Sequence, residues 1–339
     1  GVAVGDADAT DERPLARNTS SRFDLGRNFC NKLWNATRFA LGNMETPAEA
    51  GDEQPSLADR WIVSRLHRTL HEVEDSLSVY QFNRYAEAMY DFIWRDFCDW
   101  YLEAVKPTVR ERLDQQRRLH TVLDAILRML HPACPFVTET LWPHVRGMDR
   151  IRPSADDVGV PGVVLPPADR CVIAAWPVVD DAALDEEAEA MFERVRTLVS
   201  AIRNLRGERQ VPPRRRITLH APAAVLELVS AAEGAVETLA GLEGVTPDGD
   251  APTGALALAF EGGQVLLSNL VDAVDVEAER SRLAKTIEAK RKQVAGFKGK
   301  LGNAGYVDKA PPHLVEETRK MLEAAEADLS AAEASLESL

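Results

Sequence analysis

One side of the segment from Gly26 to Leu41 carries three asparagines and two arginines. At a helical turn of about 100° per residue, they fall within an arc of roughly 100° that contains no carboxylate. An ordinary solvated helix face would use Glu, Lys and Gln, because Asn is a weak helix former. Asn and Arg supply directional donors and acceptors, which suit an anionic, hydrogen-bonding partner such as RNA. This set, called the Asn/Arg face below, consists of Arg27, Asn28, Asn31, Asn35 and Arg38.

These residues have a structural alternative, in which they cap loops and bond neighbouring helices. A base splayed from an RNA loop could stack on Phe39 at the edge of the face, although an aromatic residue there also suits a core. A second polar group occurs on a long predicted helix further along the chain. It consists of Arg203, Asn204 and Arg206.

The end of the chain combines a heptad repeat with an uneven charge. Apolar residues recur at a and d spacing in residues 283–301 and again in 315–339, on either side of a Gly/Pro-rich break, which predicts an antiparallel coiled-coil hairpin. Residues 280–300 contain eight Lys/Arg and one Glu, whereas residues 314–339 contain two basic and seven acidic residues. Attraction between the two helices explains part of this distribution, but basic residues surround most of the first helix. Phosphates are natural partners of such a stripe. Its members are Arg280, Arg282, Lys285, Lys290, Arg291, Lys292, Lys298 and Lys300.

The remaining segments must position these sets. Residues 1–21 form a polar lead-in, and helical periodicity over 22–208 predicts an antiparallel helical bundle with a Pro-, Gly- and Asp-rich insertion at 146–170. Residues 209–272 then form a small α/β module, and 273–339 form the hairpin. The predicted fold class is therefore mainly α. Within the α/β module, strands are expected at 216–220, 255–260 and 264–270, and one or two helices at 223–242.

Composition limits the function classes. The net charge of −14 argues against non-specific coating of nucleic acid, although the charge is unevenly spread. No apolar run reaches the roughly 18 residues of a membrane helix. The acidic N-terminus lacks a signal peptide's apolar core, and the chain begins without Met, so we expect a fragment or a processed product. The four cysteines form no Cys-x-x-Cys pair, which favours buried thiols in a reducing cytoplasm over a zinc or disulfide framework.

Other motifs offer little catalytic chemistry. His67 and His71 stand at i, i+4, a spacing that can bind zinc. Glu72 follows the second histidine, so the metalloprotease order His-Glu-x-x-His is not met, and we interpret the pair as a solvated helix face. The run 213–216, Pro-Arg-Arg-Arg, fits a phosphate contact and a solvated strand entry equally well. We therefore expect no catalytic residue and no metal site.

The chain resembles the C-terminal portion of valyl-tRNA synthetases from about Ser21 to its end. The HPACPFVTETLW element is similar across synthetases for isoleucine, leucine, methionine and valine, whereas FCDWYLEAVKP and the terminal coiled coil point to valine. A bacterial isoleucine enzyme would usually end in a cysteine zinc site, which is missing here. The lead-in and the 146–170 insertion have no counterpart that we can place. The resemblance is carried, in chain order, by GRNFCNKLWNATRFAL, DRWIVSRLHRTL, FIWRDFCDWYLEAVKP, LRMLHPACPFVTETLW, VSAIRNLRGER and LGNAGYVDKAPPHLVEETRKML.

The resemblance implies that the bundle is the anticodon-binding domain of a class I synthetase and that the hairpin is a tRNA-binding arm. Such a chain, a cytoplasmic monomer, would position valine tRNA for ATP-dependent aminoacylation. The His-Ile-Gly-His and Lys-Met-Ser-Lys-Ser signatures and the editing domain do not occur here, so the chain alone is expected to be inactive. ATP and Mg²⁺ would belong to the parent enzyme's catalytic domain, and no cofactor is expected in this chain. The alternatives are a non-enzymatic coiled-coil adaptor that binds a protein, or a synthetase for another branched amino acid.

Overall fold

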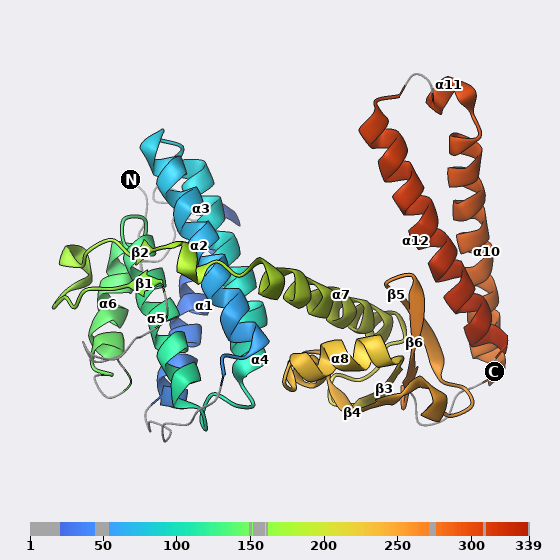
Figure 1. The fold of residues 1–339 in the computed structure, drawn as a ribbon, viewed down its shortest axis with the longest axis horizontal. Helices are drawn as coiled ribbons and strands as arrows, with labels where there is room; N and C mark the ends of the chain where they lie inside the picture. Colours follow the sequence, from blue (N-terminus) through green and yellow to red (C-terminus); the bar gives the residue numbers. More distant parts are fainter. Residues whose placement is uncertain are drawn as a thin grey trace, which may run out of the picture. The chain divides into compact units, whose positions relative to one another are not determined.

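The structure, a computed structural model, describes residues 21–44, 54–148, 151, 160, 162–270, 276–307 and 310–337. The lead-in up to residue 20 and most of the predicted insertion between 149 and 161 lie outside the described residues. The chain forms two units, and the boundary between them lies between Asp185 and Glu186. Two short segments that precede this boundary, 55–61 and 103–107, belong to the second unit. Figure 1 shows the elements of both units.

The first unit is a helical bundle. Aromatic and aliphatic side chains fill its core, among them Phe97, Leu119 and Ile126, each with no exposed surface. Helical periodicity predicted this arrangement, because apolar residues at i, i+3 and i+4 spacing place one stripe of each helix inside. Its helices are α1 (Ser21–Met44), α2 (Leu57–Ser78) from residue 62 onward, α3 (Phe82–Tyr90), α5 (Leu113–Leu130) and α6 (Pro135–Arg146), with a π-helix, η1, at Asp91–Tyr101. The short helix α4 (Leu102–Val105) follows η1 and, after its first residue, belongs to the second unit.

The π-helix η1 has an aromatic-rich sequence, which indicates a mostly buried helix. Phe92, Phe97 and Tyr101 are indeed buried, but the backbone widens from the α to the π form over these 11 residues. A π turn shifts each following side chain around the helix axis, so a regular α period could not predict its register. The widened turn still presents Trp94 to α1, as described below.

A segment of little regular structure ends the first unit. Two short strands, β1 (Val163–Val164) and β2 (Val178–Val179), pair antiparallel, with 3-10 turns η2 (Cys171–Ile173) and η3 (Asp181–Ala183) after β1 and β2 respectively. Arg128 of α5 fixes this segment. Its guanidinium donates to the carbonyl oxygens of Pro166 at 2.8 Å and Ala175 at 2.9 Å, and it forms a buried ion pair with Asp124 at 2.5 Å. Residues 162–170 of the predicted insertion are thus tied to the bundle.

The second unit begins with helix α7 (Glu186–Glu208), which the sequence groups with the bundle. The elements that follow α7 form a mixed sheet with strand order β4-β3-β6-β5. Strands β3 and β4 are parallel and are connected through α8 and α9, whereas β6 runs antiparallel to both β3 and β5. These elements are β3 (Ile217–Ala221), α8 (Ala223–Ala231), α9 (Ala235–Ala240), β4 (Leu242–Pro247), the 3-10 turn η4 (Asp248–Asp250), β5 (Leu256–Phe260) and β6 (Gly263–Ser268).

Sequence reasoning predicted three of the four strands and missed β4. That strand carries Gly and Pro, which are depleted in strands, so its pattern is weak. The β5–β6 hairpin has a tight turn: Glu261 and Gly262 both adopt positive φ, at 49° and 75°, as a two-residue type I′ turn requires. Arg194 of α7 pairs with Glu261 at 2.6 Å and so fixes this turn to the helix.

Two long helices, α10 (Val276–Leu301) and α12 (Pro312–Glu337), lie side by side, with the short helix α11 (Ala304–Val307) between them in the chain (Figure 1). Leu283, Ile287 and Val294 of α10 are buried. At the far end, the Tyr306 hydroxyl hydrogen-bonds to Thr318 at 2.9 Å. At the near end, α12 packs on strand β5, where the Ala257 amide donates to the Ser335 hydroxyl at 2.9 Å.

All four cysteines are free thiols, and two of them are expected to resist thiol reagents. Burial is the main cause that raises the pKa of Cys98 and of Cys171 to about 12. At pH 8 their thiolate population is then roughly 10³-fold below that of an ordinary cysteine. We expect 5,5′-dithiobis-(2-nitrobenzoate) to modify the half-buried Cys30 readily and to reach Cys98 and Cys171 only after unfolding, as measured by peptide mass spectrometry. Modification of Cys171 in the folded protein at the rate of Cys30 would contradict the assignment.

Candidate nucleic-acid interface

The five residues of the Asn/Arg face all lie on the exposed side of α1. Arg27 forms a surface ion pair with Asp24 at 2.9 Å. Within the described ranges, the other four make no hydrogen bond or ion pair, so the loop-capping alternative finds no support there. Their donors and acceptors are available to a partner.

The opposite side of α1 explains why this face points outward. Leu33 and Ala40 have no exposed surface, and Phe29 stacks on Tyr90 with ring centroids 5.7 Å apart. Tyr90 stacks in turn on Trp94 at 5.4 Å. The Lys32 ammonium lies 3.9 Å from the centre of the Trp94 ring and forms an ion pair with Asp99 at 2.5 Å. Aromatic packing and one cation therefore fix the rotation of α1.

Trp34 corrects the prediction for this helix. As a large aromatic residue it is expected beside the core side chains of α1, yet 42% of its surface is exposed. At about 100° per residue it lies about 40° from Arg38 and 60° from Asn31, next to the Asn/Arg face. Phe39, the predicted stacking residue, is half-buried. The helical angle of Trp34 was a signal that sequence reasoning missed, because tryptophan usually belongs to a core.

The three residues predicted as a group on α7, Arg203, Asn204 and Arg206, do not lie in one cluster. Asn204 lines a groove beside α10, whereas Arg203 and Arg206 line a different pocket. The Arg203 guanidinium donates to the Leu239 carbonyl at 2.8 Å. Arg206 is engaged further: its two terminal nitrogens donate to five carbonyl oxygens at 2.9–3.4 Å, in residues 212–215 and 240–241. Arg206 thereby ties two loops together, which is a structural role that its residue type did not reveal.

The pocket next to Arg206 has a volume of about 790 Å³ and is strongly basic. Four arginines line it and no carboxylate does. Burial lowers the pKa of Arg206, and the neighbouring positive charge of Arg216 lowers that pKa further. In the described part of the chain, Arg214 and Arg216 are exposed and make no hydrogen bond or ion pair. The pocket is thus suited to an anion. Its arginines are Arg203, Arg206, Arg214 and Arg216.

The basic residues of α10 separate into two groups. Lys290, Arg291 and Lys298 form ion pairs with acidic residues of α12, at 2.6, 2.7 and 2.7 Å. These ion pairs confirm the attraction between the two helices that the charge distribution predicted. Arg282 donates to the Glu208 carbonyl, and the side chain of Arg280 is not among those described.

The other three basic residues of α10 are exposed and make no ion pair or hydrogen bond with any described residue. At about 100° per residue they lie within roughly 80° of one another and opposite the buried side of the helix. The charge of this face is therefore not neutralised by the neighbouring helix. These residues, called the outer lysines below, are Lys285, Lys292 and Lys300.

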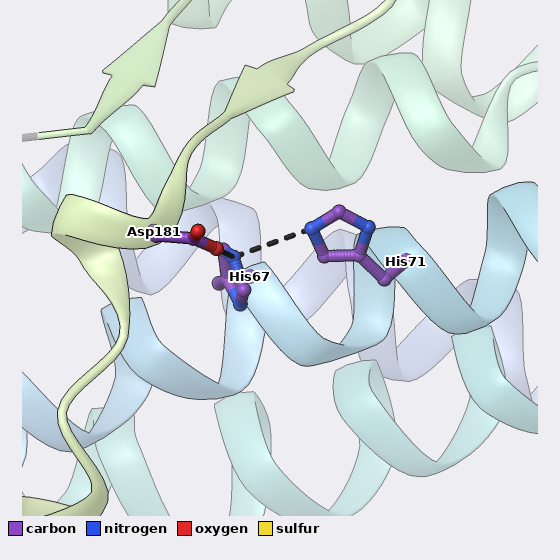
Figure 2. Close-up of side chains that lie close together, drawn as sticks. All are labelled: His67, His71 and Asp181. Atoms are coloured by element: carbon purple, nitrogen blue, oxygen red, sulfur yellow. Dashed lines mark hydrogen bonds and ion pairs between the residues drawn. The ribbon is translucent and has the colours of Figure 1, made fainter.

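The histidine pair on α2 differs from its prediction. His67 is only 6% exposed, so the expected solvated face is wrong for this residue. Its Nε2 lies 3.2 Å from Nε2 of His71 and 3.3 Å from a carboxylate oxygen of Asp181, as Figure 2 shows. The local sequence could not reveal this, because Asp181 comes from the distant η3 segment.

Among the described residues, no helix combines the length and the apolarity that crossing a bilayer requires.

Comparisons with known proteins agree with this geometry. Residues 59–221 match the family described as the anticodon-binding domain of tRNA ligase, and residues 275–339 match the valyl tRNA synthetase tRNA binding arm. The chain is 38% identical to a valine–tRNA ligase of Dechloromonas aromatica and 36% identical to one of Thermotoga maritima. Each alignment covers 88% of the chain but 32% of the relative. The chain thus spans about a third of the length of these curated relatives.

Proposed function

We propose that the chain belongs to the valyl-tRNA synthetase family and is the tRNA-recognition part of a cytoplasmic valine–tRNA ligase. In this proposal it binds one valine tRNA as a monomer and positions it for ATP-dependent aminoacylation. The chemistry, with ATP and Mg²⁺, takes place in a catalytic domain outside the sequence described here. Its proposed functional domains are the anticodon-binding bundle (22–208), a small α/β linker (209–272) and the tRNA-binding arm (273–339).

The observation that carries the proposal is the Asn/Arg face. Four of its side chains lack partners among the described residues, and they lie on helix α1, which precedes the residues 59–221 that match an anticodon-binding family. Unstacked anticodon bases expose hydrogen-bonding edges, which Asn and Arg can bind. Trp34 offers a ring on which such a base can stack. We propose that this helix contacts the anticodon loop.

We propose that α10 and α12 form an antiparallel coiled coil whose outer face follows the tRNA backbone. Buried Leu283, Ile287 and Val294 occupy the heptad positions toward α12, and the outer lysines lie opposite them. Around the helix, Gly296 lies between Lys292 and Lys300, and Gly299 lies about 20° beyond Lys292. No heavy atom lies within 4 Å of the position that a Cβ would take at either glycine. Glycine weakens an exposed helix by about 1 kcal/mol relative to alanine. Because glycine has no side chain, the two glycines would allow a phosphodiester backbone to approach this face closely, which gives them a role despite their cost in helix stability.

The basic pocket supplies a third proposed contact. Arg214 and Arg216 are exposed there, while Arg206 fixes the loop that carries them. A phosphate between these arginines would be held by charge-assisted hydrogen bonds. This favours the phosphate interpretation of the 213–216 run over a merely solvated strand entry.

The adaptor alternative has little support. It requires apolar surface on the arm beyond the seam, and on the described residues of the two helices the large exposed apolar side chains are Leu314 and Met321 of α12. The relatives named above are ligases for valine, which also disfavours a synthetase for another branched amino acid.

Replacement of Asn31 and Asn35 by alanine tests the proposed anticodon contact. We expect the double variant to bind valine tRNA roughly 30-fold more weakly, since each lost hydrogen bond is worth about 1 kcal/mol. Its thermal stability should not fall, because both side chains are exposed and alanine favours a helix. Affinity is measured by fluorescence anisotropy of labelled tRNA at fixed salt. Asn83→Ala, which removes an exposed asparagine from α3, is the matched control and should bind like the wild type. Equal affinity of the double variant and the control would exclude these two residues from the interface.

A further inference from the structure

Three side chains that commonly bind metals converge in the first unit, and none of them is among the residues assigned to tRNA. His67 and His71 lie one turn apart on α2, and Asp181 is the first residue of η3. One ligand atom from each lies within 4.8 Å of the other two. Figure 2 shows the two imidazole rings and the carboxylate approaching a common point.

The distances match those of a tetrahedral metal centre. Two ligands at about 2.0–2.1 Å from a tetrahedral Zn²⁺ lie about 3.3–3.4 Å from each other. Nε2 of His67 is 3.2 Å from Nε2 of His71 and 3.3 Å from Oδ1 of Asp181. Two edges of the ligand triangle therefore have the required length before any ion binds. The third can adjust, because the Asp181 side chain is 96% exposed.

We propose that His67, His71 and Asp181 bind a divalent transition-metal ion, with Zn²⁺ as the preferred ion. Two imidazoles and one carboxylate are a ligand set that Zn²⁺ uses in proteins, whereas Mg²⁺ and Ca²⁺ prefer oxygen ligands alone. Water completes the tetrahedron from the open side of the site, where His71 and Asp181 are exposed. This replaces the expectation of no metal site that the sequence alone favoured.

The surrounding structure orients the ligands to different degrees. The η3 turn is fixed at its start, where Asp180 accepts a hydrogen bond from the Ala182 amide at 2.9 Å, and just after its end, where the Asp185 amide donates to Ser64 of α2 at 2.9 Å. The buried Nδ1 of His67, by contrast, has no hydrogen-bond partner among the described residues. Metal-bound histidines usually donate this proton to an acceptor, and loss of such a partner weakens binding about 10–100-fold. We therefore expect micromolar rather than nanomolar affinity.

A second cluster in the first unit is less suited to a metal. It consists of His131, Glu139 and Cys171. Burial and the nearby carboxylates raise the pKa of Cys171 to about 12, which opposes the thiolate that a metal requires. Nδ1 of His131 is already hydrogen-bonded to Thr138 at 2.7 Å. This cluster provides an internal comparison for the experiment.

A bound ion would tie η3 to α2. The segment that leads into α7 would then be held by metal coordination in addition to the hydrogen bond between Asp185 and Ser64. Anything that binds only the folded state raises its stability, so Zn²⁺ should raise the melting temperature of the chain. That effect needs neither tRNA nor the rest of the enzyme.

The test uses the full chain, freed of metal with a chelator, and titrated with Zn²⁺ in a calorimeter and with Co²⁺ in a spectrophotometer. We expect one Zn²⁺ per chain with micromolar Kd, and Co²⁺ absorption bands of the intensity typical of four-coordinate sites. His71→Ala should abolish both signals and the Zn²⁺-dependent rise in melting temperature, and Asp181→Asn should weaken binding at least tenfold. His71 and Asp181 are exposed, so both variants are expected to fold.

Two control variants keep the proposal falsifiable. His144→Ala removes an exposed histidine from α6, and His131→Ala disrupts the second cluster. Both should bind Zn²⁺ like the wild type. Absence of binding to the wild-type chain, or binding that survives His71→Ala, would overturn the proposal and leave the three residues as a hydrogen-bonded cluster. Neither result bears on tRNA recognition.

Discussion

Replacing Arg128 with leucine is expected to lower the free energy of unfolding of the bundle by about 3–5 kcal/mol. The side chain of Arg128 is 1% exposed and that of Asp124 is 7% exposed, so their ion pair is removed from water. The variant leaves the Asp124 carboxylate buried without its cation. It also removes the donors to the Pro166 and Ala175 carbonyls and the stacking on Trp142, whose ring centre lies 5.0 Å from the guanidinium.

Chemical denaturation followed by circular dichroism measures this effect. Arg95→Leu is the matched control, because Arg95 pairs with Asp91 on the surface, where both side chains are more than half exposed. An exposed pair contributes about 1 kcal/mol or less. Replacing both Asp124 and Arg128 by leucine should recover part of the lost stability, because the buried charge is then gone. An Arg128→Leu variant no less stable than Arg95→Leu would show that the 162–178 segment does not depend on this residue.

Reversal of the outer lysines, Lys285, Lys292 and Lys300 to Glu, is expected to weaken tRNA binding roughly 10²–10³-fold at about 0.1 M salt. Each lysine that neutralises a phosphate releases counterions on binding, so the variant should also have a salt slope smaller by about 3. Arm stability should change little, since these residues are exposed and make no ion pair within the described structure. The measurement is tRNA affinity over a salt series.

The paired residues of the arm provide the control for this reversal. Exchanging the charges of one pair, Lys298→Glu with Glu326→Lys, keeps both the net charge and the ion pair. We expect the exchanged variant to keep most of the affinity and of the salt slope. If the triple reversal binds tRNA like this control, the outer face of α10 does not contact RNA. From the sequence alone, the eight basic residues of residues 280–300 are equivalent candidates, whereas the structure leaves three of them exposed and without an ion pair or hydrogen bond among the described residues.

Much of the helical fold could be predicted from the sequence, because its helices have strong apolar periods. The bundle core and the burial of Leu283, Ile287 and Val294 on α10 follow directly from the spacing of apolar residues. The strand β4 and the π form of η1 could not be predicted in this way. Strand β4 takes its position from parallel pairing with β3, and η1 departs from the 3.6-residue period on which the prediction depended.

The candidate site was predictable where a helix surface alone defines it. The Asn/Arg face is exposed as expected, because its position depends only on the apolar stripe on the opposite side of α1. Residues whose role depends on distant contacts were not predictable. Arg206 binds carbonyls that follow it in the chain, and His67 is buried beside Asp181, so in both cases tertiary packing rather than residue type decides the role.

The most direct test of the account is the affinity of this chain for valine tRNA and for leucine tRNA over a salt series. We expect tight, valine-selective binding with a steep salt slope, because we propose that the Asn/Arg face contacts bases and that the outer lysines contact phosphates. Equal affinity for the two tRNAs, or no measurable binding to either at about 0.1 M salt, would contradict it.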